Sequence, residues 1–161
     1  MNLKINWQWH RFKELTPFQM EAMFALRQQV FIIEQDCPYP DIDGKDQQAY
    51  HLLAWSEGHS DKPSNKRLIA TLRVFESYHQ YQNMASIGRI CTHQSVRKDG
   101  VGRLLVSKAI EFIEESYPGK GIQIGAQFYL KKFYQGLGFE QISDIYDEDG
   151  IDHVLMLRGG C

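Results

Sequence analysis

The residues with the clearest chemical potential are 96–102, which read Val-Arg-Lys-Asp-Gly-Val-Gly and contain the pattern Arg-x-x-Gly-x-Gly. Two glycines in three residues allow a tight turn and let backbone N–H groups approach a ligand closely. The amphipathic helix that follows adds unpaired N–H groups and the positive end of its dipole. Together these features favour a phosphate or pyrophosphate site. Such glycine spacing also occurs in plain tight turns, so other parts of the chain must support this interpretation.

A tyrosine further along the chain is the candidate proton donor. Residues 133–139 read Phe-Tyr-Gln-Gly-Leu-Gly-Phe, which predicts a short helix that ends at glycines. A tyrosine, with a reference pKa near ~10, is protonated at neutral pH and can act as a general acid. The short helix alone favours a core role for Tyr134. Together with the glycine loop upstream, we predict a catalytic role.

Two acidic stretches indicate the charge of a second substrate. Residues 34–46 carry five carboxylates against one lysine, and residues 144–152 carry five carboxylates with no lysine or arginine. Such runs are usually solvated loops, but if both line one cleft they favour a cationic acceptor such as a primary amine. The candidates for the base that deprotonates it are Glu34, His51, His93 and His153, and a chain of water molecules would also serve.

Composition limits the remaining classes of function. The 161 residues, 43% of them hydrophobic, predict one domain (1–161) with a substantial core, and the net charge of −2 argues against a general nucleic-acid binder. Three scattered cysteines (Cys37, Cys91 and Cys161) predict neither a disulfide framework nor a structural metal site. We expect no signal peptide, no membrane span and a cytoplasmic location.

Hydrophobic periodicity predicts a mixed α/β fold. Strands are expected at residues 3–9, 50–55, 68–75, 85–92, 122–126, 139–145 and 153–158. Helices are expected from Thr16-Pro17 to about residue 33, from residue 101 to Pro118-Gly119, and over 128–135, with a hairpin loop at 57–66 and a turn at Asp149-Gly150. The second of these helices is expected to carry on one apolar face Val101, Leu104, Leu105, Ala109, Phe112 and Ile113. The strand–helix–strand segment 85–126 predicts a right-handed crossover between parallel strands. The result is a mixed, mostly antiparallel sheet flanked by helices.

The order strand, Arg-x-x-Gly-x-Gly, helix, strand, helix, with residues 133–139 beyond it, resembles the GNAT acetyltransferase superfamily. The N-terminal half resembles its ElaA-like branch. The matching residues are Leu26-Arg27, Val30-Phe31, Glu34-Gln35, Cys37-Pro38-Tyr39-Pro40, Asp43-Gly44-Lys45-Asp46, His51, Gly88-Arg89-Ile90 and Ala126-Gln127. Lys98 departs from the commonest pattern, in which many members carry glycine, but leaves Arg-x-x-Gly-x-Gly intact.

The resemblance implies an enzyme that moves an acetyl group from acetyl-coenzyme A to a primary amine of a small molecule or peptide, without a metal. The implied cofactor-binding residues are Ile90, Cys91, Thr92, Arg97, Lys98, Asp99, Gly100, Val101, Gly102, Gln127 and Tyr134. Tyr134 would protonate the departing thiolate, and Glu34 is the candidate base. The expected acceptor-binding residues are Glu34, Asp43, Asp46, His51 and His153.

Two other functions share these sequence features. An acyl-homoserine-lactone synthase would use a similar fold, with Leu26-Arg27, Val30-Phe31, Asp43 and Asp46 in comparable places, but would need a longer acyl-chain tunnel. A coenzyme A-binding module without catalysis is the third possibility, and the intact Tyr134 argues against it. Slow hydrolysis of acetyl-coenzyme A, inert binding, or a preference for long acyl groups would separate the three. Exposed sheet edges would also permit a homodimer.

Overall fold

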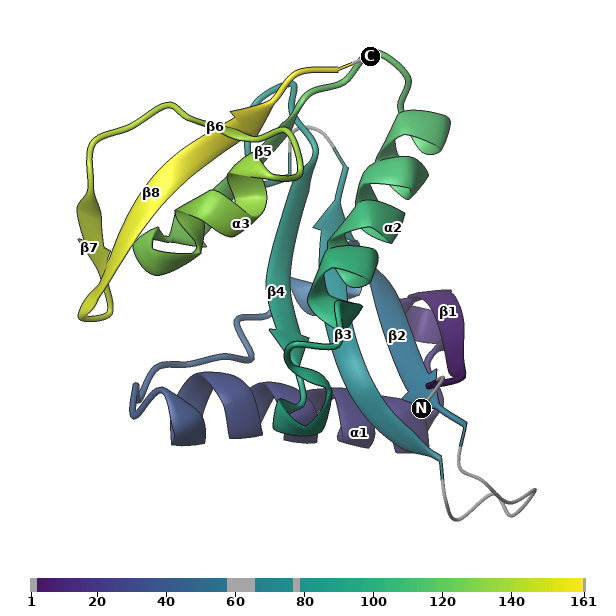
Figure 1. Cartoon of the computed structure of the whole chain (residues 1–161). Helices are drawn as coiled ribbons and strands as arrows, with labels where there is room; N and C mark the ends of the chain where they lie inside the picture. Colours follow the sequence, from purple (N-terminus) through teal and green to yellow (C-terminus); the bar gives the residue numbers. More distant parts are fainter. Residues whose placement is uncertain (1–2, 58–65, 77–78, 161) are drawn as a thin grey trace. The chain divides into compact units, whose positions relative to one another are not determined.

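A computed structural model describes residues 3–57, 66–76 and 79–160 (Figure 1). Contacts divide the chain into two compact units. The first comprises Met1–Arg73 with Arg89–Val106, and the second comprises Val74–Gly88 with Ser107–Cys161. The single domain expected from the sequence stays a prediction.

The first sheet has the strand order β1-β2-β3-β4. Its strands are β1 (Ile5–Arg11), β2 (Tyr50–Ser56), β3 (Arg67–Phe75) and β4 (Ser86–Thr92). β1 and β2 are antiparallel, with Ile5 opposite Ser56 and Arg11 opposite Tyr50. β4 is therefore an edge strand of this sheet. The predicted loop at 57–66 lies mostly outside the described residues.

Helix α1 (Pro17–Arg27) begins where the sequence predicts. The Gln19 N–H donates to Thr16 Oγ1 at 3.2 Å, the Thr16 N–H donates to Gln19 Oε1 at 2.9 Å, and Pro17 needs no hydrogen-bond partner for its nitrogen. After Arg27 the helix continues as wider π-helical turns, η2 (Gln28–Glu34). One side of this continuous helix packs into a core formed by Leu15, Met23, Leu26, Val30, Leu53, Trp55, Leu68 and Cys91.

The second sheet is built around β8 (Ile151–Arg158), which pairs antiparallel with β5 (Ile122–Gln127), β6 (Glu140–Gln141) and β7 (Tyr146–Glu148). Alternate residues of β5 and β8, including Ile124, Ala126, Val154 and Met156, are buried. Helix α2 (Val101–Ser116) buries Val101, Leu105, Val106, Ala109, Ile110 and Ile113, and α3 (Lys131–Gln135) follows β5. Short 3-10 turns occupy Phe12–Glu14, Asp46–Gln48, Gln94–Val96 and Phe128–Leu130.

The predicted mixed α/β fold with mostly antiparallel strands is confirmed, with three corrections. The strands form two sheets, and the parallel contact that we expected is a single bridge between Ala85 and Ile122. The strand predicted at 139–145 is wrong beyond Gln141. There the Leu155 N–H donates to the Ser143 side-chain oxygen at 2.8 Å, and not to a backbone carbonyl of a neighbouring strand. Leu104 is exposed rather than part of the buried face of α2.

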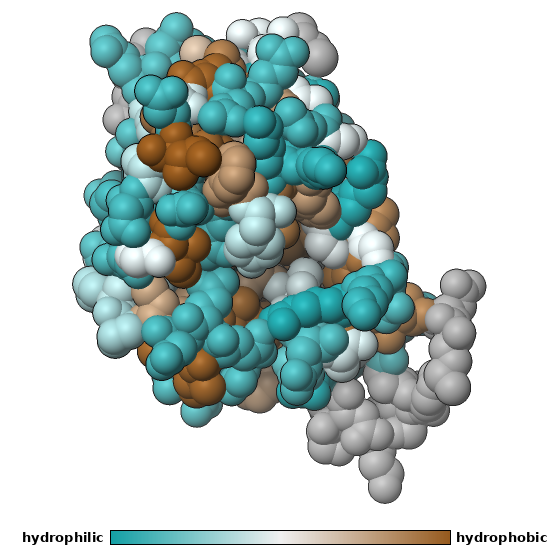
Figure 2. All heavy atoms as spheres, turned by 60° about the vertical axis from the view of Figure 1, so that its left-hand side comes forward, coloured by the Kyte–Doolittle hydropathy of each residue, from teal (hydrophilic) through white to brown (hydrophobic). Residues whose placement is uncertain are grey.

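The face of the molecule drawn in Figure 2 is mixed in character. On the face drawn in Figure 2, brown apolar side chains occur in small groups separated by teal polar ones. Among the described residues, no helix is long and apolar enough to cross a membrane.

Candidate active site

The glycine loop, residues 96–102, lies between the end of β4 and the first turn of α2. Its backbone makes the tight turn that the sequence predicts. Lys98 (φ +77°) and Gly100 (φ +78°) both adopt the left-handed conformation. A Cβ atom on Gly100 would meet nothing within 4 Å, and one on Gly102 would lie 3.7 Å from Thr92 Cγ2, an ordinary contact. Packing within the protein therefore does not require glycine at 102. The space beside Gly100, directly before the first turn of α2, is open.

Lys98 is the residue that departs from the resemblance. A non-glycine residue in the left-handed region costs about 1–2 kcal/mol. Glycine would avoid this cost, so its common occurrence at this position has a conformational reason. The structure shows that lysine adopts the same turn.

Arg97 and Glu34, both expected in the site, bind each other. The Arg97 guanidinium donates to the Thr92 carbonyl oxygen at 3.0 Å and to Glu34 Oε2 at 2.5 Å. This pair ties the last π-helical turn to the beginning of the glycine loop. Arg97 is thus directed toward protein groups, and Glu34 would have to leave an ion pair in order to act as a base.

Strand β4 contains a local distortion. Arg89 has φ +49°, a left-handed conformation within an otherwise extended strand, and it follows Gly88. Such a bulge disrupts regular pairing, and an edge strand has one side that no strand of its own sheet pairs. The backbone of Ile90, Cys91 and Thr92 follows this bulge. Burial raises the pKa of the Cys91 thiol to about 12, so the thiol stays protonated at neutral pH.

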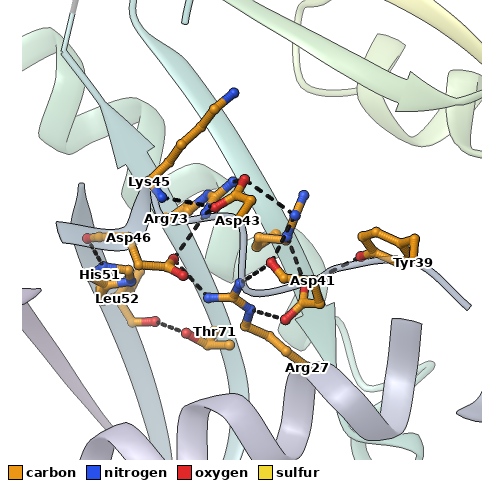
Figure 3. Close-up of polar contacts among 11 residues, drawn as sticks. Arg27, Tyr39, Asp41, Asp43, Lys45, Asp46, His51, Leu52, Thr71 and Arg73 are labelled. Atoms are coloured by element: carbon orange, nitrogen blue, oxygen red, sulfur yellow. Dashed lines mark hydrogen bonds and ion pairs between the residues drawn. The ribbon is translucent and has the colours of Figure 1, made fainter. Parts of the chain in front are cut away.

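Six charged residues in the first unit form what we call the Arg–Asp network: Arg27, Asp41, Asp43, Asp46, Arg73 and Arg89. Figure 3 labels all of them except Arg89. They come from α1, the segment 35–46, β3 and β4.

Each arginine of the Arg–Asp network binds two of its aspartates. Arg27 contacts Asp41 at 2.9 Å and Asp46 at 2.8 Å. Arg73 contacts Asp43 at 2.6 Å and Asp46 at 3.0 Å. Arg89 contacts Asp41 at 2.8 Å and Asp43 at 3.4 Å. The charges therefore balance within the network.

This balance changes the interpretation of the first acidic stretch. Burial alone would raise the pKa values of Asp43 and Asp46, but hydrogen bonds from Arg73 to Asp43 and from Arg27 to Asp46 lower them below the ordinary range. Both carboxylates are thus ionised and already paired. Direct binding of a cationic acceptor by Asp43 and Asp46 stays a prediction, and it would have to compete with arginine partners.

Two of the candidate histidines are buried and engaged. His51 is 1% exposed, and its Nε2 lies 2.8 Å from the Asp46 carbonyl oxygen, which it can reach only as a donor. His93 Nε2 lies 2.5 Å from Arg67 Nη2, and its Nδ1 lies 2.8 Å from Ser95 Oγ. Burial lowers the pKa of both rings, so both are neutral near pH 7. The structure does not bring His51 to the surface, where it would meet an acceptor.

In the second unit, Tyr134 is 5% exposed and lies between two aromatic rings. Its ring meets Phe133 and Phe139 edge-on, with centroids 5.0 and 5.9 Å away. Burial raises the pKa of Tyr134 well above its ordinary value, so the hydroxyl remains a proton donor at any physiological pH. Gln127 and His153, also expected in the site, lie opposite each other on β5 and β8.

The sequence reasoning missed Arg73, Arg89 and Asp41 as partners in the network. Arg73 interrupts the apolar run of β3 and is 4% exposed. An arginine within an apolar strand is a usable signal, since such residues are buried only when paired. The identity of the partners could not be predicted, because they lie about thirty residues away along the chain.

Comparisons with known proteins agree with this arrangement. A family model described as an acetyltransferase (GNAT) domain matches residues 45–158. The protein ElaA of Escherichia coli is 37% identical over 156 residues, 96% of each chain, and its crystal structure gives a TM-score of 0.84, covering 96% of this chain and 99% of that one. The chain therefore belongs to the GNAT acetyltransferase family, as an acyltransferase similar to ElaA.

Two other crystal structures extend the comparison. An acyl-CoA N-acyltransferase from Pseudomonas aeruginosa has a TM-score of 0.86 at 30% identity, covering 97% of this chain and 100% of that one. The AHL synthase LasI has a TM-score of 0.73 at 13% identity, covering 97% of this chain and 90% of that one. The likeness to LasI shows the fold alone.

Burial of His51 predicts a pH dependence of stability. The folded state depresses the pKa of this ring below its unfolded value near ~6.5, so stability is complete above that pH and falls as the pH drops toward the folded value. His51→Gln should remove a slope of at most about 1.4 kcal/mol per pH unit. Urea unfolding at pH 7.5 and 5.5 measures it. The control is His79→Gln at an exposed site, and equal slopes in both variants would contradict the assignment.

The bulge predicts a difference between two substitutions at Arg89. Arg89→Ala and Arg89→Gly both remove the guanidinium that contacts Asp41 and Asp43, but only glycine adopts φ +49° without strain. The glycine variant should be the more stable of the two by about 1 kcal/mol, the usual cost of this conformation. Denaturant unfolding of both variants at pH 7.5 provides the test. An alanine variant as stable as the glycine variant would show that the strand relaxes to ordinary geometry.

Proposed function

We propose that the protein transfers the acetyl group of acetyl-coenzyme A to the primary amine of a cationic small molecule or peptide. The observation that carries this proposal is the glycine loop. Its left-handed residues Lys98 and Gly100, together with Gly102 and the start of α2, would form an anion cradle in a chain of the acetyltransferase family. Acetyl-coenzyme A would supply an acetyl thioester at one end and a pyrophosphate that suits the cradle.

The loop and the edge of β4 would hold the two ends of this co-substrate. Backbone N–H groups of residues 98–102 would bind the pyrophosphate, because the space beside Gly100 is open and Gly102 itself carries no side chain. The backbone of Ile90, Cys91 and Thr92 would pair with the pantetheine arm, and an N–H group there would polarise the thioester carbonyl. The family resemblance alone supports Gln127 as a further contact.

Tyr134 would act as the general acid. Its buried hydroxyl stays protonated at physiological pH and can donate that proton to the departing thiolate. Fewer residues are available to act as the general base than the sequence suggests. Glu34 is bound to Arg97, and His51 and His93 are buried with engaged ring nitrogens. His153 differs from these residues, because its Nε2 lies 3.9 Å from the carboxylate of the exposed residue Glu148.

The remaining expectations stay predictions. These are the homodimer, the cytoplasmic location and the choice of acceptor. Acyl-homoserine-lactone synthesis is the less supported alternative, since the likeness to LasI is one of fold. A binding module without catalysis would retain affinity for acetyl-coenzyme A but would show no turnover.

Gly102→Ala tests the cradle without disturbing the fold. The new methyl group would be in ordinary contact with Thr92, so the free energy of unfolding should stay within about 1 kcal/mol of wild type. The same group would project into the proposed phosphate site, so affinity for acetyl-coenzyme A should fall at least tenfold, and further in Gly102→Val. Calorimetry measures the affinity, with Leu104→Ala on the exposed side of α2 as the control. Unchanged affinity in a folded Gly102→Val variant would refute the cradle.

Tyr134→Phe tests the general acid. The substitution keeps the ring between Phe133 and Phe139, so stability should change little. If Tyr134 protonates the thiolate, kcat should fall by about 10²–10⁴ while affinity for acetyl-coenzyme A stays near that of wild type. Steady-state kinetics with saturating substrates measures this, and Tyr117→Phe, directly after the end of α2, is the matched control. A Phe variant with full kcat, with chemistry rate-limiting, would return Tyr134 to a packing role.

A further inference from the structure

One face of the second sheet gathers aromatic and charged side chains. Strands β7 and β8 are joined at Asp149 and Gly150, which both have positive φ values (+54° and +80°), as a tight two-residue hairpin turn requires. This turn sets Tyr146 opposite His153 and Glu148 opposite Ile151. On the other side of β8, Gly125 lies opposite Leu155.

Alternation along the strands assigns these residues to a single face. Val154 and Met156 of β8 are buried, as are Ile124 and Ala126 of β5. Residues between them point to the opposite face, because side chains alternate along a strand. Gly125, Tyr146, Glu148 and His153 therefore share the face away from that core.

Two tyrosines from distant segments converge on this face. A Cβ atom on Gly125 would lie 3.1 Å from the Tyr146 hydroxyl oxygen and 3.8 Å from that of Tyr81. Both hydroxyls thus lie above the backbone of β5, at the position where the strand carries no side chain. The Tyr146 ring also lies beside that of His153, with centroids 5.9 Å apart and planes 30° apart. The Tyr146 and His153 rings thus lie together, and the Tyr81 hydroxyl lies near the same point of β5.

A carboxylate adjoins these rings. Glu148 Oε2 lies 3.9 Å from His153 Nε2, and its side chain is 56% exposed. Burial and then the charge of Glu148 raise the pKa of Tyr146 to about 12, and the same two causes raise that of Tyr81, so both phenols stay neutral. Among the described residues, Glu148 has no lysine or arginine partner.

The two acidic stretches of the chain therefore differ. In the first, Asp41, Asp43 and Asp46 are paired with arginines. In the second, residues 144–152 contain no lysine or arginine, and His153 follows them directly. Glu148 lies on the same face of the sheet as the rings of Tyr146 and His153. Negative charge that is left uncompensated beside aromatic faces attracts a cation.

We propose that Tyr81, Tyr146, Glu148 and His153 form an ammonium-binding site that recognises the cationic amine of the acceptor. The phenol rings would present their negative faces to the ammonium group, and Glu148 would supply the opposite charge. His153 Nδ1 lies 2.7 Å from the Ile151 carbonyl oxygen and must donate to it, which leaves Nε2 to accept an N–H of the ammonium group. This proposal rests on the proposed acetyl transfer for its biological meaning, and names the substrate class as primary alkylammonium ions.

Binding can be measured without turnover. We would titrate n-butylammonium chloride and its neutral isostere n-butanol into the full chain, following the aromatic ring signals of Tyr81, Tyr146 and His153 by NMR. The ammonium ion should shift these signals, and the alcohol should not. Glu148→Gln should weaken ammonium binding at least fivefold, and Tyr146→Leu should do the same, whereas Tyr146→Phe keeps the ring and should stay within twofold of wild type.

The matched control is Asp152→Asn. Asp152 is an exposed carboxylate of the same hairpin, but alternation places it on the opposite face of β8 from His153. It should change ammonium affinity by less than twofold. Equal binding of n-butanol, or equal losses in Glu148→Gln and Asp152→Asn, would overturn the proposal.

A second measurement separates this site from the proposed function. With acetyl-coenzyme A and an amine that wild type acetylates, Glu148→Gln should raise the KM for the amine at least fivefold and leave the KM for acetyl-coenzyme A unchanged. An unchanged amine KM would reject the ammonium site while acetyl transfer stands. Ammonium binding in a protein that acetylates no amine would reject acetyl transfer while the site stands.

Discussion

The first unit depends on the ion pairs of the Arg–Asp network, in which each arginine and each aspartate has partners of opposite charge. Burying arginine and aspartate side chains removes them from water at a cost of several kcal/mol per ion, and this is tolerable only because each has two partners. Removal of one member would leave an uncompensated buried charge, which typically costs about 3–5 kcal/mol. The network thus fixes the irregular segment 35–46, which has little hydrophobic surface of its own to bury, against α1, β3 and β4.

The Arg–Asp network also includes a residue of β4, the strand whose backbone we expect to contact the co-substrate. Arg89 is a member of the network and also the residue whose left-handed conformation distorts β4. Strained backbone persists where surrounding contacts hold it, and such positions concentrate at functional sites. Arg97 similarly ties the glycine loop to Glu34 at the end of the π-helical turns. Arg97, which the sequence suggests as a ligand, thus contacts protein groups in this structure.

The sequence predicts features that arise from local chemistry. Thr16-Pro17 begins a helix because a capping hydroxyl and a fixed φ act within four residues, and Asp149-Gly150 makes a tight turn for similarly local reasons. The glycine loop belongs to the same class. In contrast, the strand ends near Gln141 because the Ser143 side chain accepts a hydrogen bond from the Leu155 N–H. Hydrophobic periodicity cannot predict such a contact.

The candidate site was harder to predict, because its members are distant in sequence. The charge of residues 34–46 suggests a negative surface until Arg27, Arg73 and Arg89 are placed beside it, and hydrophobic patterns contain no information about these pairings. His51 could be recognised as titratable but not as a buried donor to Asp46. Tyr81 lies far from Tyr146 in the chain, and only the positions of their hydroxyls above Gly125 connect them.

Acetyl transfer to an amine is the central claim, and one reaction tests it directly. The full chain is incubated with acetyl-coenzyme A and a panel of polyamines, amino acids and lysine peptides, while released thiol and acetylated amine are quantified together. The account predicts thiol release that depends on a cationic primary amine and equals the amount of acetylated product. Thiol release at the same rate with and without amine, and no acetylated product across the panel, would contradict it.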